Sequence, residues 1–235
     1  MNLDAIRAVS ERVEVIGRAV LVQADCRDVL PVLPKVDAVV TDPPYGIGVI
    51  QKTYQNEKTK PGKALAHKTN YDPSETWDCE PIGAETMALL RSAGRWQIIF
   101  GGNYYDCPPT SCWLVWDKEN GDNDFADCEL AWTNLPKAVR RIKFMWNGML
   151  RANGEQRGDH PTQKPIGVMK WCIGHLPHGE TILDPFMGSG TTGVAAVQMG
   201  RDFIGVEREP KYFDIACRRI EQAQRQGDLF IGDAA

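Results

Sequence analysis

Four consecutive residues, Asp42-Pro43-Pro44-Tyr45, combine groups that could bind a planar amine. They follow the apolar run 36–41, whose length and β-branched content predict a buried parallel strand. Ligands of open α/β sheets bind at the carboxyl ends of such strands. Because proline has no N–H, the chain cannot continue the ladder, and the carbonyls of Asp42 and Pro43 are free to accept other hydrogen bonds. A carboxylate, free carbonyls and an aromatic face suit a planar group bearing NH2, although a strand-ending turn with a buried tyrosine is the alternative.

A second group of small and hydroxylated residues lies at 185–193, inside a predicted βαβ unit. The predicted elements are a strand at 181–184, a helix at 194–199 with Gly200 as its C-cap, and a strand at 203–206. Glycines let a ligand approach the backbone closely, while the helix N-terminus and the hydroxyls of Ser189, Thr191 and Thr192 offer donors to an anion. Glu207 ends the second strand and could accept hydrogen bonds from the two hydroxyls of a ribose.

The residues next to this glycine-rich turn restrict the class of ligand that it could bind. Gly188, Gly190 and Gly193 satisfy the GxGxxG dinucleotide pattern, which by itself is a weak indication. Asp184 places a negative charge at the end of the preceding strand, where a cationic group would bind. A nucleoside carrying both a carboxylate and an ammonium, such as S-adenosylmethionine, therefore fits better than a dinucleotide. A P-loop is excluded because no lysine follows Gly190 at the Walker position.

Two further positions could contact the same ligand. Asp25 follows a strand predicted at 18–24, and it could either bind a ligand's amino or hydroxyl group or cap the short helix after it. Lys164 precedes Pro165, a residue well placed in the first turn of the next helix. A lysine near the positive end of a helix makes most sense if an anion binds there.

The rest of the chain supplies elements that must position these residues. Residues 4–17 are expected to be an amphipathic or loosely attached segment, and the helix that begins near Pro210 has a core-facing apolar stripe. The remaining predicted elements are a helix at 82–90 and strands at 96–100, 112–116, 125–132 and 140–146. The last of these strands is basic and aromatic, which suits either a phosphate backbone or a charge-protected sheet edge.

Residues 46–71 have no apolar period and carry five lysines against a single Glu57. They predict a mobile basic loop for which a nucleic-acid role is favoured over a solvated linker, since the loop adjoins Tyr45. The formal net charge of −4 argues against a generally basic nucleic-acid binder but allows a locally basic face.

Length and composition, at 235 residues with no long uncharged apolar run, predict a soluble chain of one large domain or two small ones. The N-terminal residues have no secretory signal pattern, so a cytoplasmic location is expected. Seven cysteines without a CxxC or metal-type spacing predict reduced, mostly buried thiols, with neither zinc nor disulfides.

In combination these motifs resemble the β class of DNA amino methyltransferases, which methylate the exocyclic amine of adenine or cytosine. The segments that carry the resemblance, in the order typical of that class, are Asp42-Pro43-Pro44-Tyr45, His160-Pro161-Thr162-Gln163-Lys164-Pro165 and Asp184-Pro185-Phe186-Met187-Gly188-Ser189-Gly190-Thr191-Thr192. The resemblance covers residues 18–220, and the joint occurrence of these segments is far more specific than any one of them.

The resemblance implies an α/β fold, namely the Rossmann-like fold of S-adenosylmethionine-dependent methyltransferases. Its mostly parallel seven-stranded sheet would carry helices on both faces. We expect one domain over residues 1–235, with a flexible basic loop at 46–72 and a small recognition region within 117–159. The implied catalytic residues are Asp42, Pro43, Pro44 and Tyr45. The implied cofactor-binding residues are Asp25, Thr162, Lys164, Asp184, Phe186, Gly188, Ser189, Gly190, Thr191, Thr192 and Glu207, and no metal is expected.

The implied reaction is methyl transfer from S-adenosylmethionine to a flipped base in double-stranded DNA. Asp42 and Pro43 would hold the amine while Tyr45 stacks on the base. An Asp at the first position of the tetrapeptide is the usual adenine form in this family, so N6 of adenine is predicted, with N4 of cytosine as the alternative. A dinucleotide-dependent oxidoreductase leaves residues 42–45 unexplained, and a non-enzymatic DNA-binding regulator does not need an intact tetrapeptide. The expected partner is DNA, without a membrane, and a homodimer is allowed.

Overall fold

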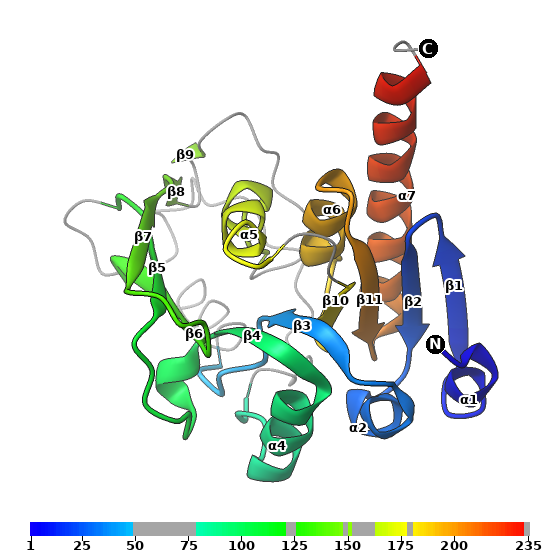
Figure 1. Cartoon of the computed structure of the whole chain (residues 1–235), viewed down its shortest axis with the longest axis horizontal. Coiled ribbons are helices and arrows are strands. Elements are labelled where there is room, and N and C mark those ends of the chain that lie inside the picture. Colours follow the sequence, from blue (N-terminus) through cyan, green and yellow to red (C-terminus); the bar gives the residue numbers. More distant parts are fainter. Residues whose placement is uncertain (49–78, 121–125, 148–149, 152–162, 178–180, 233–235) are drawn as a thin grey trace, which may run out of the picture.

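A nine-stranded mixed sheet, with strand order β1-β2-β11-β10-β3-β4-β6-β5-β7, forms the centre of the computed structural model (Figure 1). The structure describes residues 1–48, 79–120, 126–147, 150–151, 163–177 and 181–232. The strands of this sheet are β1 (Arg12–Ile16), β2 (Ala19–Gln23), β3 (Val36–Thr41), β4 (Gly94–Phe100), β5 (Trp113–Asp117), β6 (Cys128–Thr133), β7 (Arg140–Lys143), β10 (Thr181–Asp184) and β11 (Asp202–Glu207). A separate hairpin pairs β8 (Trp146–Asn147) with β9 (Leu150–Arg151).

The five strands from β2 to β4 in this order are mutually parallel, whereas β6 runs antiparallel to both β4 and β5. Their carboxyl ends therefore meet at one edge. The connections leave β10 and β3 in opposite directions across the sheet, which makes their junction the topological switch point. Ile182 and Leu183 of β10 pair with Ala38 and Val39 of β3. This register sets Asp184, the last residue of β10, opposite Val40, and Thr41 at the end of β3 donates a hydrogen bond to it, so Asp42 follows directly from this junction.

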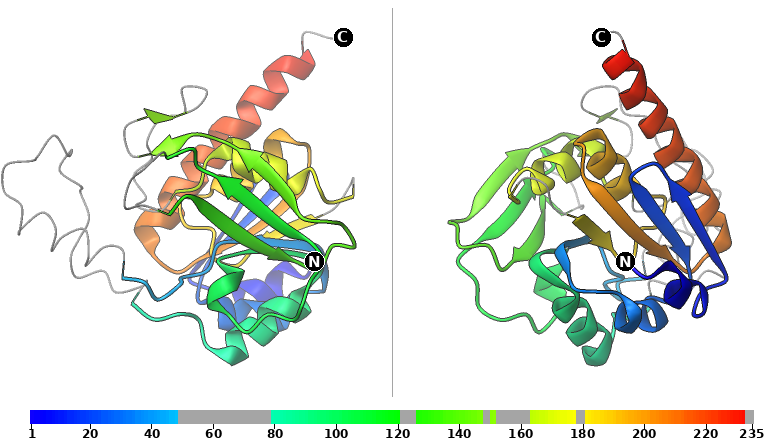
Figure 2. Two further views of the ribbon diagram at one scale, coloured as in Figure 1. Left: turned by 90° about the vertical axis from the view of Figure 1, so that its left-hand side faces the viewer. Right: turned by 45° about the vertical axis from the view of Figure 1, so that its right-hand side comes forward.

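Helices cover both faces of the sheet (Figure 1). One face carries α1 (Leu3–Arg7), α2 (Cys26–Val29) and α4 (Ala84–Ala93), and the other carries α5 (Ile166–Ile173), α6 (Thr191–Gln198) and α7 (Pro210–Gly232). Short 3-10 turns, η1 (Leu30–Val32) and η2 (Gly102–Tyr104), follow α2 and β4. The second view of Figure 2 shows α7 running along the β1–β2 edge.

Successive side chains of the central strands point to opposite faces of the sheet, and so contribute to two apolar cores, one under each layer of helices. Ala38 and Val40 of β3 belong to the apolar core under α5, α6 and α7, whereas Val39 belongs to the core under α2 and α4. Both faces of a strand flanked by helices on each side must be apolar, which is why the sequence shows continuous apolar runs there.

The sheet has nine strands where the family resemblance implied seven. The strand predicted at 140–146 forms β7 at one edge, whereas β1 at the other edge was not predicted. Residues 4–17, expected to be an amphipathic or loosely attached segment, form α1 and β1 and are joined to the sheet, so the loosely attached alternative was wrong. The Asn2 side chain caps α1 by accepting from the N–H groups of Asp4 and Ala5, and Ile6 is fully buried. β1 then pairs antiparallel with β2. A helix of five residues and a strand with only three partly buried positions are too short to give a clear period.

The loop predicted at 46–72 lies almost entirely outside the described residues, as do 121–125, 148–149 and 152–159 of the predicted recognition region. No helix in the described ranges is both long and apolar enough to cross a membrane. Three of the seven cysteine thiols, those of Cys26, Cys112 and Cys172, are buried, which is fewer than predicted.

Close packing at Gly193 sets the position of α6, whose N-terminal turn borders the site. A Cβ at this residue would lie 2.5 Å from Ile220 Cδ1 of α7 and 2.6 Å from Phe203 Cε1 of β11. We expect Gly193→Ala to lower the free energy of unfolding by about 1–3 kcal/mol, because the added methyl overfills a packed core. Denaturant unfolding measures the change.

Gly83→Ala is the matched control, since no atom lies within 4 Å of the place that a Cβ on this residue would occupy. It should cost less than about 1 kcal/mol, because only the N-cap preference of glycine for α4 is lost. Equal effects of the two substitutions would contradict the packing argument.

Candidate active site

A cavity of about 430 Å³ opens at the carboxyl ends of the parallel strands, over the switch point. It brings together most of the residues predicted to form a site. Those that line it are Asp25, Asp42, Pro44, Lys164, Asp184, Phe186, Gly188, Ser189, Thr191, Thr192 and Glu207. Pro43, Tyr45 and Gly190 are not among the lining residues, and Thr162 is outside the described residues.

The cavity also has walls that the sequence patterns did not indicate. Residues 80–83 and Thr86 close one side, and Pro81 forms an isolated antiparallel bridge with Tyr45. Met169 of α5 and Tyr212 of α7 supply apolar surface. Both lie on helices whose apolar pattern predicts only residues that face the core. Nothing in the local sequence separates these two from ordinary core residues.

The tetrapeptide projects the Asp42 carboxylate from the end of β3 into the cavity. Asp42 Oδ1 accepts a hydrogen bond from the Tyr45 hydroxyl, and Oδ2 lies 2.5 Å from Lys164 Nζ. The carbonyls that the sequence predicted to be free acceptors are those of Asp42 and Pro43, whereas the carbonyl with the close partner here is that of Pro44. The Tyr105 hydroxyl donates to the carbonyl of Pro44 and lies 3.4 Å from that of Pro43. Tyr105 was missed because an isolated tyrosine after a glycine turn carries no pattern.

The Tyr45 ring is part of an aromatic pair. It stacks on Tyr104 with 5.0 Å between ring centroids and an interplanar angle of 14°. Gly101, at φ +65°, allows this arrangement because a Cβ there would overlap the Tyr45 ring. Tyr104 is 50% exposed. The turn at 101–103, predicted only as a turn, therefore builds one wall against the tetrapeptide and extends its aromatic surface toward solvent.

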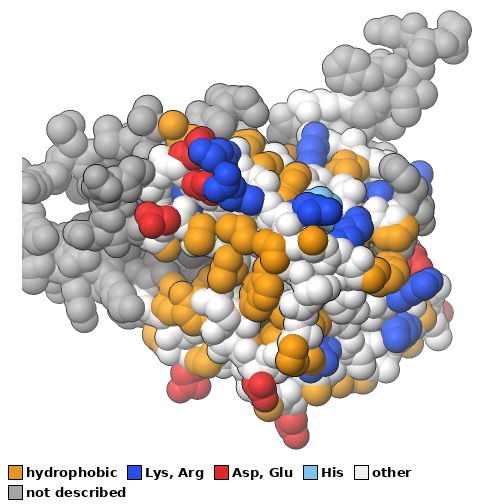
Figure 3. Space-filling view, turned by 60° about the vertical axis from the view of Figure 1, so that its left-hand side comes forward, with side chains coloured by type: hydrophobic (Ala, Val, Ile, Leu, Met, Phe, Trp, Pro, Cys, Tyr) orange, Lys and Arg blue, Asp and Glu red, His pale blue; other side chains and the backbone are white. Residues whose placement is uncertain are grey.

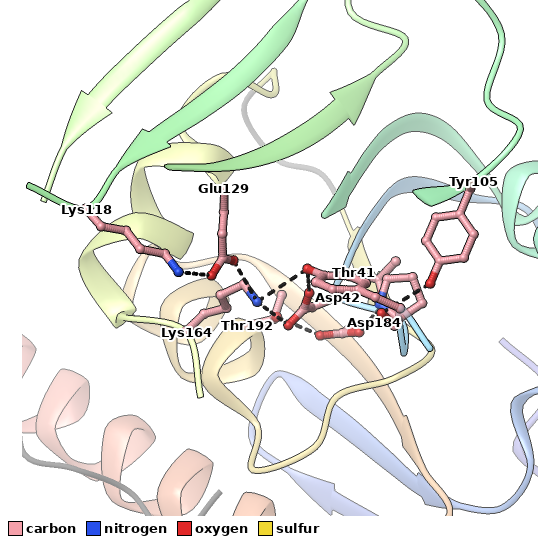
Figure 4. A network of polar contacts seen from close by, with 10 residues as sticks. Thr41, Asp42, Tyr105, Lys118, Glu129, Lys164, Asp184 and Thr192 are labelled. Atoms are coloured by element: carbon pink, nitrogen blue, oxygen red, sulfur yellow. Dashed lines mark hydrogen bonds and ion pairs between the residues drawn. The ribbon is translucent and has the colours of Figure 1, made fainter. Parts of the chain in front are cut away.

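A row of alternating charges continues from Asp42 into the protein (Figure 4). Lys164 Nζ lies 3.1 Å from Glu129 Oε2, and Lys118 Nζ lies 2.5 Å from Glu129 Oε1. Burial raises the pKa of Asp42 above its ordinary value, against the opposing effect of the Lys164 ammonium. Burial acts to lower the pKa of Lys164, but the carboxylates of Asp42 and Glu129 raise it overall. The predicted anion near Lys164 is thus supplied, in this structure, by the protein itself.

The Asp184 carboxylate is fully enclosed and joins three elements (Figure 4). Its oxygens accept from Thr41 Oγ1 at 2.7 Å, Thr192 Oγ1 at 2.6 Å and the Phe186 N–H at 3.1 Å. Burial raises the pKa of Asp184 to about 6, although these hydrogen bonds act to lower it. The Thr192 hydroxyl therefore points at Asp184, and the charge predicted to attract a cation also shapes the turn.

The glycine-rich turn is held from its far side by α7. Arg219 Nη1 donates to the Ser189 carbonyl at 2.6 Å, to Ser189 Oγ at 2.9 Å and to Thr191 Oγ1 at 3.1 Å. The sequence pattern gave α7 only a core-facing role. Arg219 shows that a polar side chain of this helix also fixes the first turn of α6, where Gly190 is the N-cap with φ +78°.

Two carboxylates stand at the opposite end of the cavity. Glu207 Oε2 accepts from the Gly188 N–H at 2.9 Å, and Glu207 Oε1 accepts from the Glu209 N–H at 2.8 Å. Burial raises the pKa of Glu207 to about 7, with these backbone N–H groups opposing the rise. Asp25 caps α2 and pairs with Arg27, which lowers the pKa of Asp25. Asp25 is thus both the helix cap and a residue of the cavity wall.

The sheet order and the cavity at its switch point define a Rossmann-like α/β protein with a nucleoside-sized site. Residues 58–218 match the family model described as DNA methylase, of the N6/N4 methyltransferase group. The chain therefore belongs to this DNA methylase family.

Two curated relatives match a shorter part of the chain. The type II methyltransferase M2.DpnII of Streptococcus pneumoniae is 45% identical over 84 residues, which are 35% of this chain and 31% of the relative. M2.LlaDCHI of Lactococcus lactis subsp. cremoris is 41% identical over 90 residues, 37% of this chain and 34% of that protein. The matched part thus spans about a third of each relative's length.

Solved structures share the fold over most of the chain. The crystal structure of an M1.HpyAVI–SAM complex superposes with a TM-score of 0.54 and 24% identity, covering 85% of this chain and 98% of that one. The PvuII DNA methyltransferase, described as cytosine-N4-specific, gives a TM-score of 0.53 and 14% identity, covering 91% and 93%. The predicted Rossmann-like methyltransferase fold is confirmed.

The raised pKa of Glu207 makes stability depend on pH. A carboxyl group whose folded pKa of about 7 exceeds its ordinary value of 4.5 favours folding when protonated, and this contribution is lost as pH rises through that window. Between pH 4.5 and 7 the free energy of unfolding of the parent should fall relative to Glu207→Gln by up to about 3 kcal/mol. Denaturant unfolding at several pH values measures the difference.

Glu85→Gln, an exposed change on α4, is the control. It should track the parent within about 0.5 kcal/mol at every pH. A parent-minus-Glu207→Gln difference that stays constant from pH 4.5 to 7 would show that Glu207 is not the group responsible.

Proposed function

We propose that this chain is an S-adenosylmethionine-dependent DNA methyltransferase that methylates N6 of adenine in double-stranded DNA. One observation carries the proposal: the Asp42 carboxylate, held by Tyr45 and Lys164, opens into the same cavity as the glycine-rich turn and Glu207. A donor nucleoside and an acceptor amine would thereby meet at the switch point. Family membership and the fold support the same function.

The residues present fit the cofactor. The carboxylates of Asp25 and Glu207 stand at one end of the cavity as acceptors for nucleoside hydroxyl or amino groups. Phe186 and Ile82 line it with apolar surface suited to an adenine ring. Gly188 and Ser189 bring backbone close to the bound molecule. When bound, S-adenosylmethionine would supply a methyl group on a sulfonium centre.

Asp42 acts on the acceptor amine. An amine conjugated with a heteroaromatic ring is a poor nucleophile because its lone pair is delocalised. A carboxylate and the Pro43 carbonyl that accept both N–H hydrogens would favour a pyramidal nitrogen and restore that lone pair. Each carboxylate oxygen has two acceptor sites, so Asp42 can accept the amine while keeping its bonds to Tyr45 and Lys164. The amine's proton leaves after transfer, and no prior deprotonation is required.

The target base would stack on aromatic surface beside Asp42. Tyr45 lies beside the carboxylate and stacks on Tyr104, whose ring is half exposed. A purine gains more from such stacking than a pyrimidine does, and an A·T pair is held by fewer hydrogen bonds than a G·C pair. Flipping a base costs a few kcal/mol, so both effects favour adenine. Asp42 at the first position of the tetrapeptide favours adenine as well, on the family resemblance.

A basic surface suited to a polyanion lies at the β7 end of the sheet. Figure 3 shows lysine and arginine side chains beside an apolar strip on this side of the molecule. Arg140, Arg141 and Lys143 of β7 are exposed. Arg141 lies 3.8 Å from Asp117 and Lys143 lies 3.5 Å from Glu119, so both pairs are loose and open to exchange for phosphates.

Product analysis tests the function directly. The protein is incubated with donor carrying a labelled methyl group and mixed-sequence duplex DNA, the DNA is digested, and nucleosides are separated. Label in N6-methyladenine is expected. Label only in N4-methylcytosine would show that the target base is cytosine, with the same type of reaction. No label in any nucleoside would contradict the proposed function.

Cofactor binding and turnover should separate in Asp42→Ala. The substitution removes the group assigned to the amine, so we expect kcat to fall at least about 100-fold, a loss typical of a removed transition-state contact. The dissociation constant of S-adenosylhomocysteine, measured by calorimetry, should change less than about threefold, since Asp42 is not assigned to the cofactor.

Asp28→Ala, an exposed change on α2, is the control and should keep both values. Near-parental methylation by Asp42→Ala would remove Asp42 from the catalytic role.

A further inference from the structure

Glu129 lies within a largely buried row of charges that leads to Asp42, and the proposed reaction assigns Glu129 no role. The row runs Lys118, Glu129, Lys164, Asp42, with closest nitrogen–oxygen distances of 2.5, 3.1 and 2.5 Å (Figure 4). The signs alternate along it. Lys118 and Glu129 come from the β5–β6 part of the sheet, whereas Asp42 directly follows β3. The row therefore connects the tetrapeptide to strands two and three positions away.

The Lys164 ammonium is already paired with carboxylates of this row. Its side chain is only 8% exposed, and its ammonium already faces the carboxylates of Asp42 and Glu129. Removing an ammonium from water is costly unless it is paired, and here two carboxylates share one cation. The ammonium also lies over the rings of Tyr45 and Phe100, at 5.6 and 5.3 Å from their centroids. These contacts fix where the cation stands before any ligand enters.

Glu129 itself does not reach the ligand. It is absent from the cavity wall, which Lys164 and Asp42 both line. Its Oε2 faces Lys164 and its Oε1 faces Lys118. β6 carries it in a strand paired on both sides, with β4 and with β5. A carboxylate so placed can influence the reaction only by holding Lys164.

We propose that Glu129, braced by Lys118, is a positioning residue: it fixes the Lys164 ammonium against Asp42 and so orients the Asp42 carboxylate toward the acceptor amine. This inference rests on the proposed function. Lys164 thereby belongs to the acceptor side of the reaction rather than to a ligand's carboxylate. Removing the Glu129 charge frees one side of Lys164 and lets the ammonium and Asp42 move together.

The matched variant is Glu129→Gln, which keeps the shape and removes the charge. We expect kcat to fall by about 10- to 100-fold, as for a small misplacement of a catalytic group. The dissociation constant of S-adenosylhomocysteine and the KM for duplex DNA should stay within about twofold, since Glu129 does not line the cavity. Glu129→Asp, which keeps the charge, should recover part of the lost kcat.

A double-mutant cycle tests whether Glu129 acts through Lys164. In a Lys164→Met background, Glu129→Gln should cause no further loss of kcat, because the link it maintains is already gone. Equal losses in both backgrounds, or a raised KM for DNA with kcat intact, would overturn the positioning role. Glu221→Gln, an exposed change on α7, is the control and should behave as the parent.

Two further measurements distinguish a failure of the proposed function from a failure of this inference. The activity of the parent is measured first. A parent that labels no nucleoside would contradict the proposed function. An active parent together with a Glu129→Gln variant of unchanged kcat would contradict only the positioning role. If Glu129→Gln fails to bind S-adenosylhomocysteine or to fold, Lys118→Met replaces it. That variant removes the brace from a partly exposed site and should lower kcat by about 3- to 10-fold on the same argument; an unchanged kcat would count against the inference.

Discussion

The hydrogen bonds that the buried Asp184 carboxylate accepts are the interaction on which the site's geometry depends. Through Thr41, Phe186 and Thr192, one side chain joins the end of β3, the glycine-rich turn and the first turn of α6. Thr41 immediately precedes Asp42, so the same contact sets where the tetrapeptide leaves the sheet. A buried carboxylate is costly unless it is well hydrogen-bonded, and three donors here satisfy it. The donor and acceptor halves of the site are thus held in fixed relative positions by polar contacts at the switch point, made mostly by residues of the cavity wall.

Most of the fold could be predicted from local pattern. The central strands are buried on both faces, so their apolar runs were continuous, and the βαβ unit around Gly190 carried its own turn and cap signals. The edges could not be predicted in the same way. β1 and α1 owe their stability to pairing with β2 and to the burial of Ile6, which are tertiary effects. A short amphipathic segment does not reveal such partners in its own sequence.

The site shows the same division. Residues within motifs, such as Asp42 and Glu207, line the predicted cavity, because a motif fixes both chemistry and its place at a strand end. Partners that reach the site from elsewhere carried no signal. Glu129 follows a cysteine in an ordinary strand and Arg219 stands in an amphipathic helix, and only the packing of distant elements brings them to Lys164 and Ser189. The spacing of residues along the sequence does not reveal a contact between residues that are far apart in the chain.

The strand order has a consequence for how the protein is made. β2 and β3 are among the first strands to be synthesised, yet the strands that lie between them, β11 and β10, come near the end of the chain. Ala19, for example, pairs with Phe203. Until those late strands emerge from the ribosome, the nascent chain carries two apolar strands with unpaired edges that can pair with other chains. The centre of the sheet closes last, so chaperone protection during synthesis should matter more for this topology than for one whose neighbouring strands follow each other along the chain.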